Sequence, residues 1–216
     1  MVDDGSATGF DQETIVALLG SAGDAPPAAV DAVQGHGLQA LLTGTPATLQ
    51  DISARSGLKL EEIRAGVEGL SAAGRIETNG EHVVGVSGLT VTETAHSLAL
   101  ADATMHTWCA LDAIGIPVAL ALDADVSTAC PHCGTHLDVT VRGGEAQADR
   151  PVRLFCPTGQ CNDVRADFCA AANLFCDLDH LQAWRATNAS VGGEELDLIA
   201  TADLGRAMWG RFATRV

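Results

Sequence analysis

Apolar and polar positions in the first ninety residues follow helical spacing and then change to strand-like alternation. Residues 11–42 carry apolar runs that are interrupted at residues 20–27 and again at Gly35 and Gly37. Glycine and proline are unfavourable inside helices, so this pattern predicts two short helices. Two further helices are predicted over residues 48–57 and 58–73, with Gly57 at their junction. One face of the second helix contains Leu58, Ile63, Val67 and Leu70.

A hairpin follows these helices over residues 74–85, with Asn79-Gly80 at its tip. Asn-Gly is favoured in two-residue hairpin turns because both positions take positive φ. Helix, glycine turn, helix and hairpin is the order of a winged helix-turn-helix. Residues 1–87 are therefore expected to form a winged-helix-like N-terminal region.

Residues 88–216 mix both periodicities and are expected to form a second, mixed α/β domain. Helices are predicted over 98–122, with a break or bend at Gly115–Pro117, and over 180–187 and 202–212. Strands are predicted over 88–96, 136–142, 151–156 and 196–200, and residues 166–176 fit a strand or a short helix. The chain as a whole is therefore predicted to be α+β.

The charge of the chain excludes several classes of partner. Its 216 residues contain 28 Asp and Glu against 12 Lys and Arg, a formal net charge of -16. Such a surface repels phosphate backbones and anionic membranes. The helix that would read DNA, near residues 60–72, offers Arg64 against Glu61, Glu62 and Glu68. We therefore expect no nucleic-acid or membrane partner, and a scaffold role for the N-terminal region.

Cysteine usage and hydropathy point to the cytoplasm. Residues 1–9 lack the basic and apolar segments of a secretory leader, and the most apolar stretch, 98–122, contains Asp102, His106 and Asp112. This stretch is therefore expected in the core rather than in a membrane. Seven cysteines is an odd number, which favours free thiols or metal ligands over a disulfide framework.

Cys109 and Asp112 are the first candidates for chemistry. On a helix, residues at i and i+3 share a face with Cβ atoms about 5–6 Å apart, so a thiol and a carboxyl there can exchange a proton. Apolar neighbours such as Trp108 and Ile114 would raise the pKa of Asp112 and suit it to general acid–base catalysis. The alternative is that Cys109 is a small core residue and Asp112 a helix-capping or surface residue.

A second group, four cysteines arranged in two pairs, predicts a metal site that resembles a zinc ribbon. The two pairs are separated by 22 residues that resemble a hairpin, and the four candidate ligands are Cys130, Cys133, Cys156 and Cys161. Tetrahedral thiolate sites hold structural zinc in such knuckles. Unligated core thiols or a different soft metal are the alternatives, and His132 and His136 are alternative ligands. The other histidines, including His180, show no ligand spacing, and Cys176 is expected in the core.

Three blocks of this sequence resemble the organomercurial (alkylmercury) lyases. These are Gly88-Leu-Thr-Val-Thr-Glu-Thr-Ala-His96, Trp108-Cys-Ala-Leu-Asp-Ala-Ile-Gly-Ile-Pro117 and Asp163-Val-Arg-Ala-Asp-Phe-Cys169. The similarity extends from about residue 40 to the end of the chain. It implies cleavage of a carbon–mercury bond by protonolysis, with Cys109, Asp112 and Cys169 in the places of the catalytic cysteines and aspartate.

The resemblance also implies the substrate and the partners. Cys109 and Cys169 would bind the mercury of a small organomercurial as soft thiolate ligands, with the apolar Trp108 beside its organic group. Mercury is substrate and product, no organic cofactor is expected, and free thiols or a mercuric reductase would accept Hg(II). A monomer is expected.

The sequence is also compatible with two other functions. The extra cysteines could make the chain a non-enzymatic thiolate metal-binding protein or a metal-responsive regulator, although the first 100 residues carry 13 acidic against 4 basic side chains. The tetrad Cys130-Pro-His-Cys133 could serve a thiol–disulfide oxidoreductase. That class needs the tetrad to open a helix, whereas Gly134 and an alternating strand follow it here.

Overall fold

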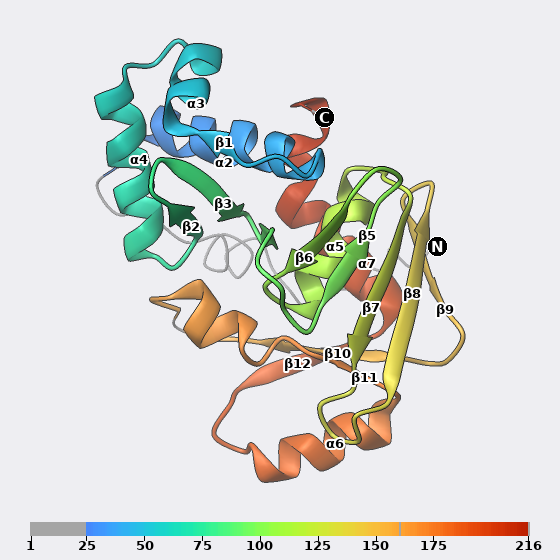
Figure 1. Ribbon diagram of the computed structural model, residues 1–216. Coiled ribbons are helices and arrows are strands. Elements are labelled where there is room, and N and C mark those ends of the chain that lie inside the picture. The colour runs from blue at the N-terminus through green and yellow to red at the C-terminus, as the bar shows by residue number, and fades with distance from the viewer. Residues whose placement is uncertain (1–24, 160, 216) are drawn as a thin grey trace, which may run out of the picture.

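The computed structural model describes residues 25–159 and 161–215 (Figure 1). The N-terminal region contains α2 (Pro27–Leu42), β1 (Ala47–Thr48), α3 (Leu49–Ser56), α4 (Leu60–Ala72), β2 (Ile76–Asn79) and β3 (His82–Val86). The helix predicted before residue 25 lies outside the described residues. The predicted succession of helix, glycine turn, helix and hairpin is present, and its assignment to the winged-helix class stays a prediction.

One helix, α2, runs through the glycines at which a break was predicted. Gly37 packs against β3 so closely that a Cβ there would lie 3.0 Å from a methyl carbon of Val86. The absence of a side chain allows this close packing of helix on strand, and the surrounding contacts outweigh the low helix propensity of glycine. The predicted interruption at Gly35 and Gly37 is therefore wrong.

The larger sheet has nine strands and crosses the predicted boundary between the two regions. Its order is β1-β3-β4-β6-β5-β7-β8-β9, with β2 paired to β3. The added strands are β4 (Leu89–Thr90), β5 (Ser97–Ala99), β6 (Thr104–Thr107), β7 (Ala124–Ala129), β8 (His136–Arg142) and β9 (Glu145–Ala148). Because β3 and β4 pair antiparallel across residues 87 and 88, backbone hydrogen bonds join the N-terminal hairpin to the rest of the chain.

The long helix predicted over residues 98–122 is wrong in its first half. Residues 97–107 form the paired strands β5 and β6, in which Leu98 and Met105 lie opposite each other and are both buried. The helix α5 covers only Ala110–Ala119, and it continues through Gly115 and Pro117. Apolar positions in a short buried strand cannot be told from a buried helix by periodicity alone.

A second sheet of three strands, in the order β11-β10-β12, carries the remaining helices. Its elements and neighbours are β10 (Arg153–Pro157), the π-helix η1 (Val164–Cys169), β11 (Leu174–Phe175), α6 (Leu178–Thr187), β12 (Gly193–Leu196), α7 (Leu198–Trp209) and the 3-10 helix η2 (Gly210–Arg215). The buried strand predicted over 196–200 is wrong. Asp197 caps α7 by accepting a hydrogen bond from the Ala200 N–H, and Ile199 is 71% exposed on that helix.

Helices α5 and α7 pack against each other and against β9 (Figure 1). Their closest approach is at two glycines, since a Cβ on Gly205 would lie 2.4 Å from the Cα of Gly115. Trp209 packs over the same place and donates an indole hydrogen bond of 2.8 Å to the Ser87 carbonyl. Within the described ranges, no helix combines the length and apolar character needed to cross a membrane.

Substitution of Gly205 by alanine tests this packing. The added methyl group has no room against Gly115, and overpacking of this kind costs about 1–3 kcal/mol. We expect Gly205→Ala to lower the free energy of unfolding by about that amount in urea titrations. Gly210→Ala is the matched control, because a Cβ at Gly210 would meet no atom within 4 Å. Equal stabilities of the two variants would contradict the close helix contact.

Candidate active site

Cys109 and Asp112 meet at the junction of β6 and α5. Cys109 is the N-cap of α5 in an extended conformation, and its N–H donates a hydrogen bond of 3.0 Å to Asp112 Oδ2. Both residues are buried, with 0% and 5% of their surfaces exposed. The expectation that they share a helical face is therefore replaced by a capping arrangement, in which the backbone of one residue holds the carboxyl of the other.

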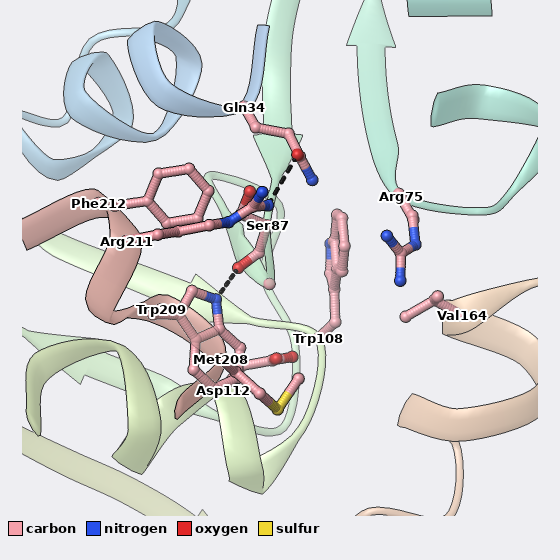
Figure 2. A pocket seen from close by; sticks show the side chains of 11 residues that line it. Gln34, Arg75, Ser87, Trp108, Asp112, Val164, Met208, Trp209, Arg211 and Phe212 are labelled. Carbon is pink, nitrogen blue, oxygen red and sulfur yellow. Dashed lines mark hydrogen bonds between the residues drawn. The ribbon is translucent and has the colours of Figure 1, made fainter. Parts of the chain in front are cut away.

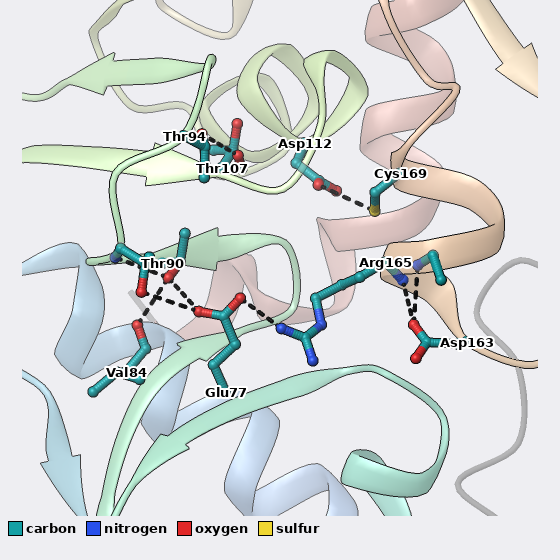
Figure 3. A network of polar contacts seen from close by, with 11 residues as sticks. Glu77, Val84, Thr90, Thr94, Thr107, Asp112, Asp163, Arg165 and Cys169 are labelled. Atoms are coloured by element: carbon teal, nitrogen blue, oxygen red, sulfur yellow. Dashed lines mark hydrogen bonds and ion pairs between the residues drawn. The ribbon is translucent and has the colours of Figure 1, made fainter.

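Cys169 reaches the same point from the end of η1, although it lies 57 positions beyond Asp112. Its Sγ is 3.9 Å from Asp112 Oδ2 and is also buried (Figure 3). The two sulfurs and a carboxylate oxygen of Asp112 all lie within 4.8 Å of one another. The structure thus brings together the three residues that the family resemblance named.

Gly88 makes room for the carboxyl of Asp112. Its φ is +94°, and a Cβ at this position would lie 2.5 Å from Asp112 Oδ1. The Gly88 carbonyl also accepts a hydrogen bond of 2.9 Å from the Trp108 N–H. No other residue type offers both the positive φ and the missing Cβ. Sequence reasoning used Gly88 only as part of a family block and did not detect this role.

Burial controls the protonation of the site. It raises the pKa of Asp112 to about 7, although hydrogen bonds from Cys109 oppose this shift. Burial also raises the pKa of Cys109 well above its ordinary value, with contributions from Cys169 and Asp112. A hydrogen bond with Cys109 lowers the pKa of Cys169, but burial and the nearby carboxyl outweigh it and the net shift is upward. Near neutral pH the site therefore holds two protonated thiols beside a carboxyl that can accept or donate a proton.

A cavity of about 440 Å³, counting its open mouth, reaches Asp112 from solvent (Figure 2). Its walls are largely apolar, with two arginines and a glutamine, and are formed by Gln34, Arg75, Ser87, Gly88, Trp108, Asp112, Val164, Met208, Trp209, Arg211 and Phe212. The Trp108 indole N–H is buried and has no hydrogen-bond partner within the described part of the chain. The arrangement suits a small apolar molecule placed next to the carboxyl.

The N-terminal region holds the segment that carries Cys169. Val164 N–H donates to the Ala73 carbonyl at 3.0 Å, and Arg165 forms an ion pair of 2.8 Å with Glu77 of β2 (Figure 3). The Arg165 guanidinium also lies over the Trp108 ring, 5.7 Å from its centroid. Backbone, ionic and cation–π contacts therefore fix η1 against the wall of the cavity.

The four cysteines predicted as a zinc set do not come together as one group. The end of β7 and the start of β8 bring Cys130 and Cys133 close to two residues at the start of α6, Cys176 and His180, with the four ligand atoms within 4.8 Å of one another. Cys156 is buried on β10 in the other sheet, because the hairpin of β8 and β9 returns within the first sheet.

Cys161 is outside both groups, on the loop that follows β10. Cys176 is buried as predicted, and it lies directly after β11. No ligand spacing was assigned to His180 from the sequence, whereas the structure places its imidazole in the cluster with Cys130, Cys133 and Cys176. Sequence spacing could have indicated it, because Cys176 and His180 are separated by three residues, a common ligand spacing.

Comparisons with known proteins agree on one family. The family model for alkylmercury lyase matches residues 89–210. Alkylmercury lyase of Bacillus cereus is 25% identical over 179 residues, covering 81% of this chain and 79% of that protein. The Streptomyces lividans alkylmercury lyase is 28% identical over 151 residues and covers 68% of each chain. A crystal structure of the mercury-bound form of MerB2 superposes with a TM-score of 0.81 at 21% identity, covering 93% of this chain and 97% of that one.

The raised pKa of Asp112 predicts a specific pH dependence of stability. The folded protein holds this proton up to about pH 7, whereas the unfolded chain releases it near pH 4. The contribution to stability is therefore complete below about pH 4 and is lost as the pH rises to about 7, by at most about 1.4 kcal/mol per pH unit. Asp112→Asn should remove this component from urea titrations made across the range, and Asp102→Asn, an exposed carboxyl, is the control. Parallel curves for all three proteins would contradict the burial of the Asp112 proton.

Proposed function

The chain belongs to the alkylmercury lyase family, and we propose that it cleaves the carbon–mercury bond of organomercurials with Cys109, Asp112 and Cys169. The observation that carries this proposal is the meeting of two thiols and one carboxyl within 4.8 Å, from segments far apart in the sequence. A purely structural role would not require two buried thiols next to a carboxyl whose pKa lies near 7.

Binding of the substrate is the first step of the proposed reaction. The mercury of R–Hg⁺ bonds to the sulfur of Cys109, and the thiol proton passes to the carboxylate of Asp112. Both sulfurs are buried thiols with raised pKa values, so each needs a base at the moment when it becomes a metal ligand. Asp112 is the only carboxyl in this group of ligand atoms among the described residues, which makes it the base.

Cleavage follows when Cys169 becomes the second ligand of the mercury. Two thiolates increase the electron density on the metal, and the carbon takes the electron pair of the Hg–C bond together with the proton held by Asp112. The products are R–H and Hg(II) bridged by Cys109 and Cys169. The order of the proton transfers follows from the single carboxyl: Asp112 releases the Cys109 proton to solvent, accepts the Cys169 proton as that sulfur becomes the second ligand, and delivers this second proton to the carbon. The reaction is therefore balanced without an oxidant, a reductant or an organic cofactor.

The cavity favours this chemistry in two ways. Its apolar walls, among them Trp108 and Met208, suit an alkyl or aryl group. They also limit water around Asp112, which keeps the pKa of the carboxyl high and makes its proton available to carbon. Hg(II) held by two thiolates would be removed by exchange with free thiols or by a mercuric reductase, which suits a reducing cytoplasm.

We also propose that residues 1–87 act as a scaffold for the catalytic residues and do not read DNA. Support comes from the contacts of Ala73 and Glu77 with η1. The face of α4 that a DNA complex would need instead carries exposed acidic residues, and Arg64 of that helix pairs with Glu81. This pairing further reduces the positive charge available to a phosphate backbone.

Hydrocarbon release tests the proposed activity directly. Purified protein is given methylmercury or phenylmercury with excess thiol, and methane in the headspace or benzene in solution is measured. We expect release by the unsubstituted protein and a loss of at least about 100-fold in Asp112→Asn and Cys169→Ser, the range typical for removal of a general acid–base group. Asp112→Asn should bind mercury more slowly but still bind it at equilibrium, since both thiols remain and their protons can pass to water.

Cys156→Ala is the thiol control for this experiment. Cys156 is buried on β10 and belongs to neither cysteine group, so its removal should leave hydrocarbon release within about twofold. Tight mercury binding by the unsubstituted protein without hydrocarbon would reject the lyase proposal and favour a metal-holding function.

The scaffold role predicts that alanine substitutions at two glycines with similar backbone conformations change the rate of hydrocarbon release by different amounts. Gly74 and Gly80 have φ of +64° and +60°, so alanine is strained at both positions. A Cβ at Gly74 would lie 2.0 Å from Asp163 Oδ1, which caps η1 by accepting from the Arg165 and Ala166 N–H groups, whereas a Cβ at Gly80 would meet no atom within 4 Å. We expect Gly74→Ala to slow hydrocarbon release several-fold relative to Gly80→Ala, at temperatures where both variants are folded. Equal rates would reject the scaffold role of this contact.

A further inference from the structure

A second cluster of soft ligands lies apart from the catalytic cysteines, where the two sheets approach each other. It consists of Cys130, Cys133, Cys176 and His180, contributed by the turn between β7 and β8 and by the start of α6 (Figure 1). We propose that these four residues form a structural zinc site of the Cys3His type. The site is independent of the proposed lyase chemistry, because it shares no residue with Cys109, Asp112 and Cys169.

The distances between the ligand atoms fit a tetrahedral zinc ion. Zn–S bonds of about 2.3 Å and Zn–N bonds of about 2.0–2.1 Å place two sulfurs about 3.8 Å apart and a sulfur and a nitrogen about 3.6 Å apart. In the structure, the sulfurs of Cys133 and Cys176 are separated by 3.6 Å, and Cys130 Sγ lies 3.7 Å from His180 Nδ1. A disulfide would need sulfurs about 2.05 Å apart, so this arrangement fits shared coordination better than a bond between Cys133 and Cys176.

The first ligand pair is on a turn with the shape of a metal knuckle. Cys130 N–H donates to the Thr135 carbonyl at 2.9 Å, and Gly134 N–H donates to the Cys130 carbonyl at 2.8 Å. Gly134 has a φ of +73°, which reverses the chain directly after Cys133. These bonds close the loop around the Cys-x2-Cys pair and point both sulfurs to the same side, as a chelating pair requires.

The second pair is fixed by the start of a helix. Asp177 caps α6 by accepting a hydrogen bond of 2.9 Å from the His180 N–H, so the backbone from Cys176 to His180 forms one rigid turn. The three-residue spacing of these ligands is typical of zinc sites. The ring of His132 lies 4.9 Å from that of His180, which further restricts the orientation of the imidazole.

Polar neighbours compensate the charge of such a site. Three thiolates and one Zn²⁺ carry a net charge of −1, and outer-shell donors usually balance it. Arg150, paired with Asp149, also interacts with Cys176. The Cys133 thiol donates a hydrogen bond of 3.1 Å to Thr135 Oγ1, and the same hydroxyl can donate to this sulfur once it is a thiolate. A tetrahedral set of three sulfurs and one imidazole nitrogen is chemistry that selects zinc over oxygen-preferring cations.

The proposed ion would link the two sheets of the fold. Cys130 and Cys133 belong to the turn of β7 and β8 in the larger sheet, whereas Cys176 directly follows β11 in the smaller one. The segment between Cys169 and β11 is short, so the link would anchor the strand that follows the second catalytic cysteine. We therefore assign the site a structural role that limits movement of this part of the chain.

Metal content of the full chain tests the proposal. The protein is produced in zinc-supplemented medium, purified under reducing conditions without chelator, and analysed for zinc by mass spectrometry. We expect about one zinc per chain and at least tenfold less in Cys133→Ser and His180→Asn. Cys156→Ala, Cys161→Ser and Cys109→Ser should retain the metal, because none of these residues belongs to the cluster. Circular dichroism checks that each variant is folded.

Cobalt supplies a readout that does not depend on any variant. Protein stripped of zinc and given Co²⁺ alone should show thiolate-to-cobalt charge transfer and the intense visible bands of a tetrahedral site. Absence of zinc and of these bands from the unsubstituted protein, or a disulfide between Cys133 and Cys176 under reducing purification, overturns the proposal. Loss of zinc in Cys156→Ala or Cys161→Ser with retention in His180→Asn overturns the ligand set.

Discussion

The arrangement of the candidate active site depends on one reciprocal helix cap between Cys109 and Asp112. The Cys109 N–H holds Asp112 Oδ2 at the first turn of α5, and this hydrogen bond fixes the end of β6, the start of the helix and the position of the carboxyl. The carboxyl is at once a structural acceptor and the neighbour of two thiols. Its second oxygen is confined by Gly88, whose missing side chain leaves the necessary room. A capping residue is ordinarily exposed, and here its burial changes the chemistry that it can perform.

Cys169, the third member of the candidate active site, is positioned by contacts from distant parts of the chain. Cys169 lies on a π-helix, an element uncommon in proteins and often found at functional sites. The first turn of that element is held by Asp163 and by the N-terminal hairpin, and Arg165 connects Glu77 with the Trp108 ring. The N-terminal region and the catalytic region thus share one sheet and one polar network (Figure 3).

The chain keeps two groups of thiols in different environments. Cys109 and Cys169 are buried beside Asp112, and of these three residues only Asp112 lines the apolar cavity. Cys130, Cys133 and Cys176 lie with a histidine between the two sheets, where Cys133 is exposed. A carboxyl that can move a proton is present only in the first of these clusters. This difference supports the two separate roles that we propose, protonolysis at the first cluster and structural zinc binding at the second.

Three local sequence blocks were enough to identify the family, and the apolar periodicity was enough to predict the α+β class. The same blocks named Cys109, Asp112 and Cys169, which the fold brings within 4.8 Å of one another. Alternation also predicted strand β8 with its observed bounds. The hairpin of β2 and β3 was predicted as well, but its turn is Gly80-Glu81 rather than Asn79-Gly80, because Asn79 pairs with His82. The strands β5 and β6 within residues 97–107 emerged only from the three-dimensional arrangement, because short buried strands and helices have similar apolar patterns. The residues that lie next to Cys130 and Cys133 also depend on the three-dimensional arrangement. Strand order places β10 in another sheet, and this long-range pairing separates Cys156 from them and brings Cys176 and His180 close.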